Sequence, residues 1–259
     1  MNTPKLISGF ERQNQILQWI NLQQRISINE VCEQFMVSQA TARRDLETLA
    51  GKGKVQRVHG GAIAVEKAPP EMPMLLRQID QAAEKQRIGV AGARLVNDGE
   101  TVFLGSGTTV LEVARNLKDR HNLTVITNSL PVVNLLSENP EITIVCIGGM
   151  LRPSELSFIG HITEQDLAEV RADKVFIGVR AINLEEGLTN DYLPETMTDR
   201  AILKIGHETI VVADHTKFGR VSTVMLVPIE RVQTLITGGE TSEDFIKEVI
   251  KRNIRIIVV

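Results

Sequence analysis

Residues 37–49 have the sequence VSQATARRDLETL. Ser38 can cap the N-terminus of a helix there, because its hydroxyl can accept a hydrogen bond from an unpaired backbone N–H. Small and apolar residues then recur at the spacing of one buried helix face, namely Ala42, Leu46 and Leu49. The remaining surface keeps two adjacent arginines beside short hydroxyl and amide side chains, so this helix is predicted to present a basic, polar surface to a partner.

Two more helices are predicted before this stretch, one over residues 12–23 and one that passes Phe35 with Asn29 as its N-cap. After it, residues 54–65 are typical of two short strands around a glycine-containing tip at residues 59–61. Two helices joined by a short turn and followed by such a hairpin, or wing, form a winged helix-turn-helix. In that module the third helix enters the major groove of DNA and the wing follows the backbone.

Seven side chains of this head are predicted to contact double-stranded operator DNA. They are short hydrogen-bonding groups at the start of the third helix, its two arginines, and two residues of the wing: Ser38, Gln39, Thr41, Arg43, Arg44, Arg57 and His59. A structural alternative exists, because adjacent arginines are common on solvated helices and Arg44 could simply pair with Asp45 or Glu47.

The charge distribution supports a DNA-binding head. Residues 1–67 contain nine lysines and arginines against six acids, whereas the rest of the chain contains 20 against 26. Only the head is therefore expected to meet a polyanion. Three prolines within residues 66–73 break regular structure. We therefore predict a DNA-binding domain over 1–66, a linker over 67–75 and an effector domain over 76–259.

Several classes of protein are disfavoured. No apolar run approaches the roughly 20 residues that span a bilayer, and the N-terminus lacks the pattern of a signal peptide, so a cytoplasmic location is expected. Cys32 and Cys146 are far apart and have no second cysteine at metal-ligand spacing. We interpret them as reduced core thiols and expect neither a metal nor a cofactor.

The larger part of the chain alternates short apolar runs with helical patterns. Strands are predicted over 101–104, 123–126, 142–147, 174–177, 209–213, 232–236 and 254–259, with helices over 110–117, 131–136, 195–205 and 242–252. Such alternation is typical of an α/β domain with a mostly parallel sheet covered by helices. Ligands of these sheets bind beyond the carboxyl ends of the strands.

The residues at those ends are suited to a phosphate and to hydroxyl groups. Glycines let the backbone approach an anion, helix N-termini offer free N–H groups, and a few charged side chains follow. The predicted effector-binding residues are Ser106, Gly107, Thr108, Thr109, Asn128, Ser129, Gly149, Arg152, Asp214 and Lys217. Each also has a purely structural interpretation as a turn, a helix cap or a solvated loop residue, so their joint placement at strand ends carries the prediction.

The sequence also resembles a known family. Residues 37–49, followed by RVHGGA at 57–62, are similar to the winged-helix signature of DeoR-type bacterial transcriptional regulators of sugar metabolism. The likeness continues through GTT at 107–109, TNS at 127–129, GG at 148–149, EGL at 186–188 and DHTKFG at 214–219, which resemble the ribose-phosphate-isomerase-like effector domain of that family.

The resemblance implies a repressor whose inducer is a phosphorylated sugar or a related metabolite. It implies that the phosphate lies on Gly107, Thr108 and Thr109, and that the sugar is surrounded by Asn128, Ser129, Asp214 and Lys217. One departure stands out, because Asp199 occupies the position before Arg200 where the family usually has a lysine.

Two other functions are open at this point. An aldose-ketose isomerase would need a carboxylate base and a cation, which Asp214 or Glu195 and Lys217 could provide. A dinucleotide-dependent sensor is less well supported, because residues 105–110 lack the third glycine of the fingerprint. We predict a non-enzymatic repressor that binds its operator as a homodimer or homotetramer, because such operators have two half-sites, and that is released by a sugar phosphate.

Overall fold

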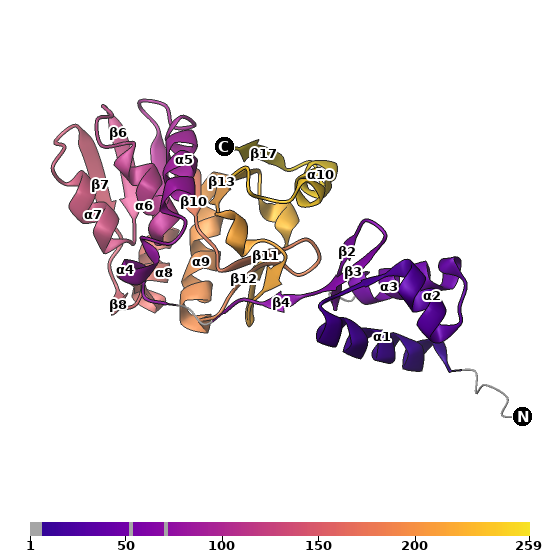
Figure 1. Ribbon diagram of the computed structural model, residues 1–259. Coiled ribbons are helices and arrows are strands. Elements are labelled where there is room, and N and C mark those ends of the chain that lie inside the picture. Colours follow the sequence, from indigo (N-terminus) through magenta and orange to yellow (C-terminus); the bar gives the residue numbers. More distant parts are fainter. Residues whose placement is uncertain (1–6, 52–53, 70–71) are drawn as a thin grey trace, which may run out of the picture. The chain divides into compact units, whose positions relative to one another are not determined.

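The computed structural model describes residues 7–51, 54–69 and 72–259, and the chain divides into two compact units, residues 1–67 and 68–259 (Figure 1). Residues 70 and 71, within the predicted linker, lie outside the described part. Among the residues described, no helix combines the length and the apolar character that a membrane crossing needs.

The first unit is a winged helix-turn-helix. Its elements are α1 (Gly9–Gln23), β1 (Arg25–Ser27), α2 (Ile28–Phe35), α3 (Gln39–Gly51), β2 (Val55–Val58), β3 (Gly61–Ala64) and β4 (Glu66–Lys67). Strands β2 and β3 form the predicted wing, and β1 pairs antiparallel with β3 as a third strand. Gly60 turns the wing in the left-handed region at φ 80°, where glycine has no steric penalty. Apolar side chains from all three helices and the strands form one core.

The start of α2 differs from the prediction. Ser27, not Asn29, is the N-cap, because its hydroxyl accepts a hydrogen bond from the backbone N–H of Glu30 while the Glu30 carboxylate accepts one from the backbone N–H of Ser27. This reciprocal arrangement is a capping box and satisfies two N–H groups at once. The Asn29 side chain instead accepts a hydrogen bond from Gln39 at the start of α3.

Asp45 on α3 binds two side chains of α1. This buried carboxylate accepts hydrogen bonds from Arg12 Nε at 2.6 Å and Gln13 Nε2 at 2.9 Å. Replacing Asp45 with alanine should lower the free energy of unfolding of the first unit by about 1 to 3 kcal/mol, because both donors lose their acceptor. Urea unfolding followed by the fluorescence of Trp19, the single tryptophan of the chain, measures it. The exposed neighbour Glu47→Ala is the control, and equal midpoints for both variants would contradict the prediction.

The second unit contains a seven-stranded sheet in which every neighbouring pair is parallel. From edge to edge the order is β17 (Arg255–Val258), β16 (Thr234–Thr237), β13 (Gly206–Val212), β10 (Ala172–Ile177), β5 (Thr101–Leu104), β6 (Leu123–Thr127) and β7 (Ile142–Cys146). The predicted α/β class and parallel sheet are thus confirmed. Cys146 is exposed on the edge strand β7, so the prediction of a core thiol is wrong there, whereas Cys32 is half-buried.

Helices cover the sheet. They are α4 (Met74–Arg77), α5 (Ala82–Ala93), α6 (Thr108–Arg115), α7 (Leu130–Leu136), α8 (His161–Ala168), α9 (Leu193–Ile205) and α10 (Glu243–Lys251), with short 3₁₀ turns at His215–Lys217 and Ile229–Arg231. Alternate strand residues pack into opposite layers: Phe176 lies in the core with α5, α6 and α7, whereas its neighbour Val175 lies in the core with α8 and α9.

Smaller strands extend this unit. The hairpin β8 (Met150–Arg152) and β9 (Ser157–Ile159) follows β7, and β11 (Ala181–Asn183), β12 (Gly187–Asn190) and β15 (Val224–Val227) form a separate antiparallel sheet, with β14 (Arg220–Val221) nearby in sequence.

The strand order reverses between β5 and β10. Chain progression from β5 runs through β6 to β7 toward one edge, whereas β10 lies on the other side of β5 and progresses through β13 and β16 to β17. At such a switch point the loops leaving two adjacent strands diverge to opposite faces and open a crevice at their carboxyl ends. The fold therefore places its natural ligand site after Leu104 and Ile177.

Candidate functional site

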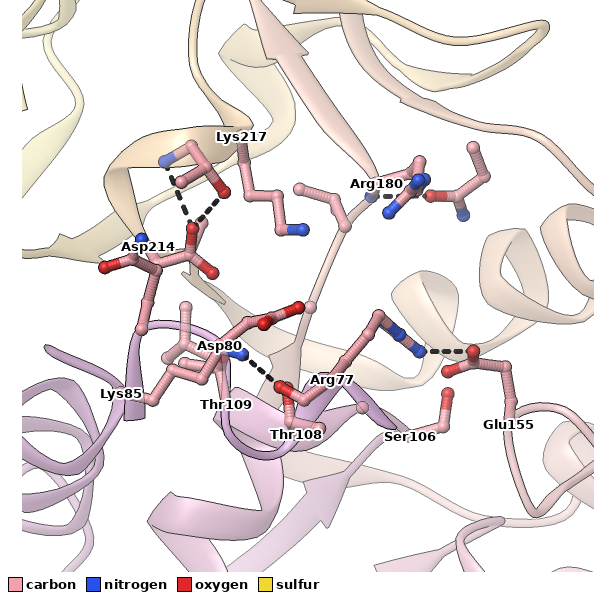
Figure 2. Close-up of a pocket in the computed structure, with 18 of the residues that line it drawn as sticks. Arg77, Asp80, Lys85, Ser106, Thr108, Thr109, Glu155, Arg180, Asp214 and Lys217 are labelled. Carbon is pink, nitrogen blue, oxygen red and sulfur yellow. Dashed lines mark hydrogen bonds and ion pairs between the residues drawn. The ribbon is translucent and has the colours of Figure 1, made fainter. Parts of the chain in front are cut away.

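A cavity of about 540 Å³ lies at this switch point and is lined by the loops that follow β5, β10 and β13, together with residues around α4 and α5 (Figure 2). Its volume is in the range of small-molecule sites. Six of the ten predicted effector-binding residues line it: Ser106, Gly107, Thr108, Thr109, Asp214 and Lys217. Polar and charged side chains make up much of its wall.

The loop after β5 offers an anion-binding arrangement. Gly107 has φ 102° and precedes α6, whose first residues Thr108 and Thr109 are buried. The free N–H groups and positive dipole end of such a helix attract an anion. The Ser106, Thr108 and Thr109 hydroxyls make no hydrogen bond within the part of the chain that the structure describes, although they face a cavity (Figure 2). These donors are available to a ligand.

Two lysines, which we call the cationic side, line the same cavity. Lys217 points into it (Figure 2), and its ammonium group has no hydrogen-bond or ion-pair partner among residues 7–51, 54–69 and 72–259. Burial lowers the pKa of Lys217, as do the charges of Arg180, Arg77 and Lys85, while Asp214 opposes the shift. Burial likewise lowers the pKa of Lys85, which donates a hydrogen bond to the carbonyl oxygen of Arg77 at 2.8 Å. A bound anion would stabilise the charged form of both ammonium groups.

Asp214 and its neighbours hold the Lys217 loop in place. The Asp214 carboxylate accepts hydrogen bonds from the Thr216 backbone N–H at 3.1 Å and from the Thr216 hydroxyl. Glu84 on α5 accepts the backbone N–H of His215 at 2.8 Å and lies 2.7 Å from His215 Nδ1. The cavity therefore has a fixed wall behind Lys217.

Glu84, His215 and Glu240 place potential metal-ligand atoms within 4.8 Å of one another. Their contacts already account for this cluster, because Glu84 binds His215 and Glu240 pairs with Arg87 at 2.7 Å. Nothing in the cluster requires an ion.

Three carboxylates form what we call the acidic side of the cavity: Glu155, Glu195 and Asp199. Arg77 pairs with Glu155, and Arg152 pairs with Glu195, which also accepts the Ser157 hydroxyl at 3.2 Å. Burial raises the pKa of Asp199, the charge of Glu195 raises it further, and Arg152 opposes the shift. The cavity thus has chemically different sides.

Four predicted effector-binding residues do not line the cavity: Asn128, Ser129, Gly149 and Arg152. They follow β6 and β7, which lie beyond β5 on the side away from the switch point. Asn128 donates to the carbonyl oxygen of Phe158 at 2.9 Å, and the guanidinium of Arg152 lies 4.5 Å from the centroid of the Tyr192 ring. Their role in effector binding stays a prediction, although Arg152 pairs with Glu195 of the cavity wall.

Several cavity residues were not predicted. Arg180 belongs to the strand-end motif GVR at 178–180, so the sequence contains a signal that can identify it as a site residue. Arg77 and Lys85 precede the first strand of the sheet, where no strand-end signal points to them. Glu155 lies in the hairpin between β8 and β9, which has no periodic pattern.

In the first unit, the predicted DNA-contacting side chains are mostly accessible. The exposed side chains are Gln39, Arg43, Arg44 and His59, whereas Arg57 is half-buried. At the start of α3, the hydroxyl oxygens of Ser38 and Thr41 lie 3.0 Å apart. Neither Arg43 nor Arg44 forms a side-chain hydrogen bond or ion pair with any described residue. Asp45 is engaged by Arg12 and Gln13 instead, so the alternative that Asp45 neutralises Arg44 is wrong.

The two units match two families of known domains. Residues 12–68 match the DeoR-like helix-turn-helix domain, and residues 80–239 match the DeoR C terminal sensor domain. The transcriptional repressor AccR of Agrobacterium fabrum is 35% identical over 232 residues, 89% of this chain and 90% of that protein. The glycerol-3-phosphate regulon repressor of Escherichia coli is 34% identical over 229 residues, 88% and 90% of the two chains.

Among solved structures, ribose 5-phosphate isomerase A from Methanocaldococcus jannaschii is similar with a TM-score of 0.41 and 20% identity, over 54% of this chain and 55% of that one.

Proposed function

The chain belongs to the DeoR family of DNA-binding transcriptional regulators, and on that premise we propose that it represses an operon of carbohydrate metabolism and releases its operator when a phosphorylated sugar fills the cavity. The head supplies DNA binding, and the second unit supplies the sensor.

One observation carries this proposal: the group of unengaged donors at the switch point. Thr108 and Thr109 at the start of α6, together with Lys217, offer hydroxyl, backbone N–H and ammonium groups to a single small ligand. A phosphate accepts several hydrogen bonds and carries negative charge, so it fits this set better than a neutral group would. A sugar attached to it would extend toward the acidic side, where carboxylates can accept hydroxyl hydrogen bonds.

The names of relatives support the carbohydrate part of the proposal. One relative is a glycerol-3-phosphate regulon repressor, and another, from Escherichia coli O157:H7, is a putative aga operon repressor that is 30% identical over 251 residues.

For the effector to release DNA, it must bind more tightly to the regulator that is free of DNA than to the regulator on its operator. A coupling of about 1 to 3 kcal/mol would change DNA affinity roughly 5- to 150-fold, enough for induction.

Assembly and location complete the proposal. The regulator binds as a homodimer or homotetramer, because helix-turn-helix proteins commonly occupy two half-sites one DNA turn apart. It acts in the cytoplasm, where its operator lies. We infer that the second unit is a sensor and not a catalyst. The candidate base Glu195 is held by Arg152 and Ser157, and a DNA-binding head gives the cavity a sufficient role.

Fluorescence anisotropy tests this function. The full chain is mixed at fixed salt with labelled DNA from upstream of its own and neighbouring genes, then titrated with a panel of sugar phosphates. Release by at least one compound, and no turnover of that compound, is the expected result. Binding with no release by any compound would leave a DNA-binding protein without a sugar-phosphate effector. Turnover of a sugar phosphate would instead support the isomerase alternative.

A further inference from the structure

Asp199 is a buried carboxylate on the cavity wall that forms no ion pair with any residue that the structure describes. It lies on α9 with 8% of its surface exposed, and Asn190 Nδ2 donates a hydrogen bond to its Oδ2 at 2.8 Å. The Asn190 amide is oriented for this role, because its oxygen accepts the backbone N–H of Arg180 at 3.1 Å. Within the described residues, the other Asp199 oxygen has no hydrogen-bond donor.

The two neighbouring carboxylates differ from Asp199 in this respect. Arg77 pairs with Glu155 and Arg152 pairs with Glu195, so each has an arginine beside it. A carboxylate is costly to bury unless a donor or a cation compensates it. Burial and the charge of Glu195 accordingly raise the pKa of Asp199, with Glu155 adding to the shift. An additional cation at this position would relieve that cost.

On the cationic side of the cavity the situation is reversed, because a positive charge there lacks a counter-ion among the described residues. Lys217 has no partner for its ammonium group among the residues that the structure describes, and its pKa is lowered by burial and by surrounding cations. Lys217 and Asp199 both line this cavity, yet they form no ion pair with each other. The cavity therefore contains a cation and a carboxylate that each lack a counter-ion among the described residues. A ligand that satisfies both must carry an anion and a cation.

We propose that Asp199 makes this cavity selective for a phosphorylated sugar that bears a protonated amino group, with the phosphate on the cationic side and the ammonium group on Asp199. This inference rests on the proposed function and specifies its effector. A hydroxyl group could donate a hydrogen bond to Asp199, but an ammonium group also supplies the missing charge. Charge-assisted hydrogen bonds are roughly twice as strong as neutral ones.

Isothermal titration calorimetry of the full chain tests the proposal with matched ligands. The pairs are glucosamine 6-phosphate with glucose 6-phosphate and galactosamine 6-phosphate with galactose 6-phosphate, plus the N-acetylated form of each amino sugar phosphate. In at least one pair the amino compound should bind about tenfold or more tightly than its hydroxyl analogue, the size of one charge-assisted hydrogen bond. Its N-acetylated form, which lacks the charge, should lose that advantage.

Asp199→Asn tests the residue itself, because an amide keeps the shape and can still accept the Asn190 hydrogen bond. The variant should bind the amino compound about tenfold more weakly and the hydroxyl analogue unchanged. Asp119→Asn, at an exposed aspartate beyond α6, is the matched control and should change neither affinity. Urea unfolding establishes that the variant is folded. If it is not, the comparison of amino, hydroxyl and N-acetyl compounds on the unaltered chain still decides the matter.

The outcomes separate this inference from the proposed function. Equal or tighter binding of the hydroxyl compounds, or an amino preference that Asp199→Asn retains, would overturn the role of Asp199. Operator release by a sugar phosphate without an amino group would then leave the proposed function standing. No binding and no operator release by any sugar phosphate of either panel would overturn both.

Discussion

Operator binding should weaken by about 1 to 3 kcal/mol per recognition helix when Arg44 is replaced with alanine, and the preference for operator over random DNA should fall with it. A helix turns once in about 3.6 residues, so Arg44, two positions after the buried Ala42, lies about half a turn from the core face. Its exposed guanidinium has no partner among the described residues and can form a bidentate contact with a guanine edge.

Arg43 provides an internal comparison. It lies one position after Ala42 and so leaves the helix at the side, where a DNA phosphate is the expected partner. Arg43→Ala should weaken binding to all sequences alike and reduce the salt slope by about 1. Anisotropy at several salt concentrations distinguishes the two effects. Arg231→Ala, at an exposed arginine of the second unit, controls for net charge. Unchanged affinity at physiological salt for both Arg43→Ala and Arg44→Ala would show that α3 is not the reading helix.

The head could be predicted closely because its signals are local. Helical spacing, the Ser38 cap and the glycine at the tip of the wing each act over a few residues, and they agree with one another. The wrong N-cap of α2 was avoidable, since Ser27 and Glu30 have the spacing of a capping box while Asn29 has no such partner. The ion pair between Arg12 and Asp45 could not be predicted from the sequence, because residues 33 positions apart meet only through the tertiary packing of α1 on α3.

The cavity could be predicted only in part, and the limit is the order of the strands. Apolar runs reveal where each strand ends, and this brought Thr108 and Lys217 into the predicted site. They do not reveal which strands are neighbours. The sequence therefore gives Asn128 after β6 the same standing as Thr108 after β5. The reversal of strand order between β5 and β10 places the cavity beside Thr108 and not beside Asn128. Arg77 comes from α4, outside the sheet, and no periodicity indicates that it reaches Glu155.

A weakened effector response is the largest change we expect in the second unit, and Lys217→Met should produce it. The substitution removes the ammonium group but keeps most of the length of the aliphatic stem, so cavity shape changes little. A hydrogen bond from a charged group contributes about 1.5 to 3 kcal/mol, and affinity for the sugar phosphate should fall by that amount. Operator binding without effector should be unaffected, because Lys217 lies in the second unit and α3 in the first.

The response of Lys217→Met is measured by titrating the operator complex with effector and following anisotropy. The titration midpoint should move to a concentration roughly ten- to a hundredfold higher, by conversion of the affinity loss. Lys204→Ala, at an exposed lysine near the end of α9, should leave the midpoint in place. A normal midpoint in Lys217→Met would mean that the phosphate does not bind beside Lys217. The unengaged hydroxyls of Thr108 and Thr109 would then have to hold the anion with the α6 N-terminus alone. A half-buried lysine with no partner among the described residues would need another explanation.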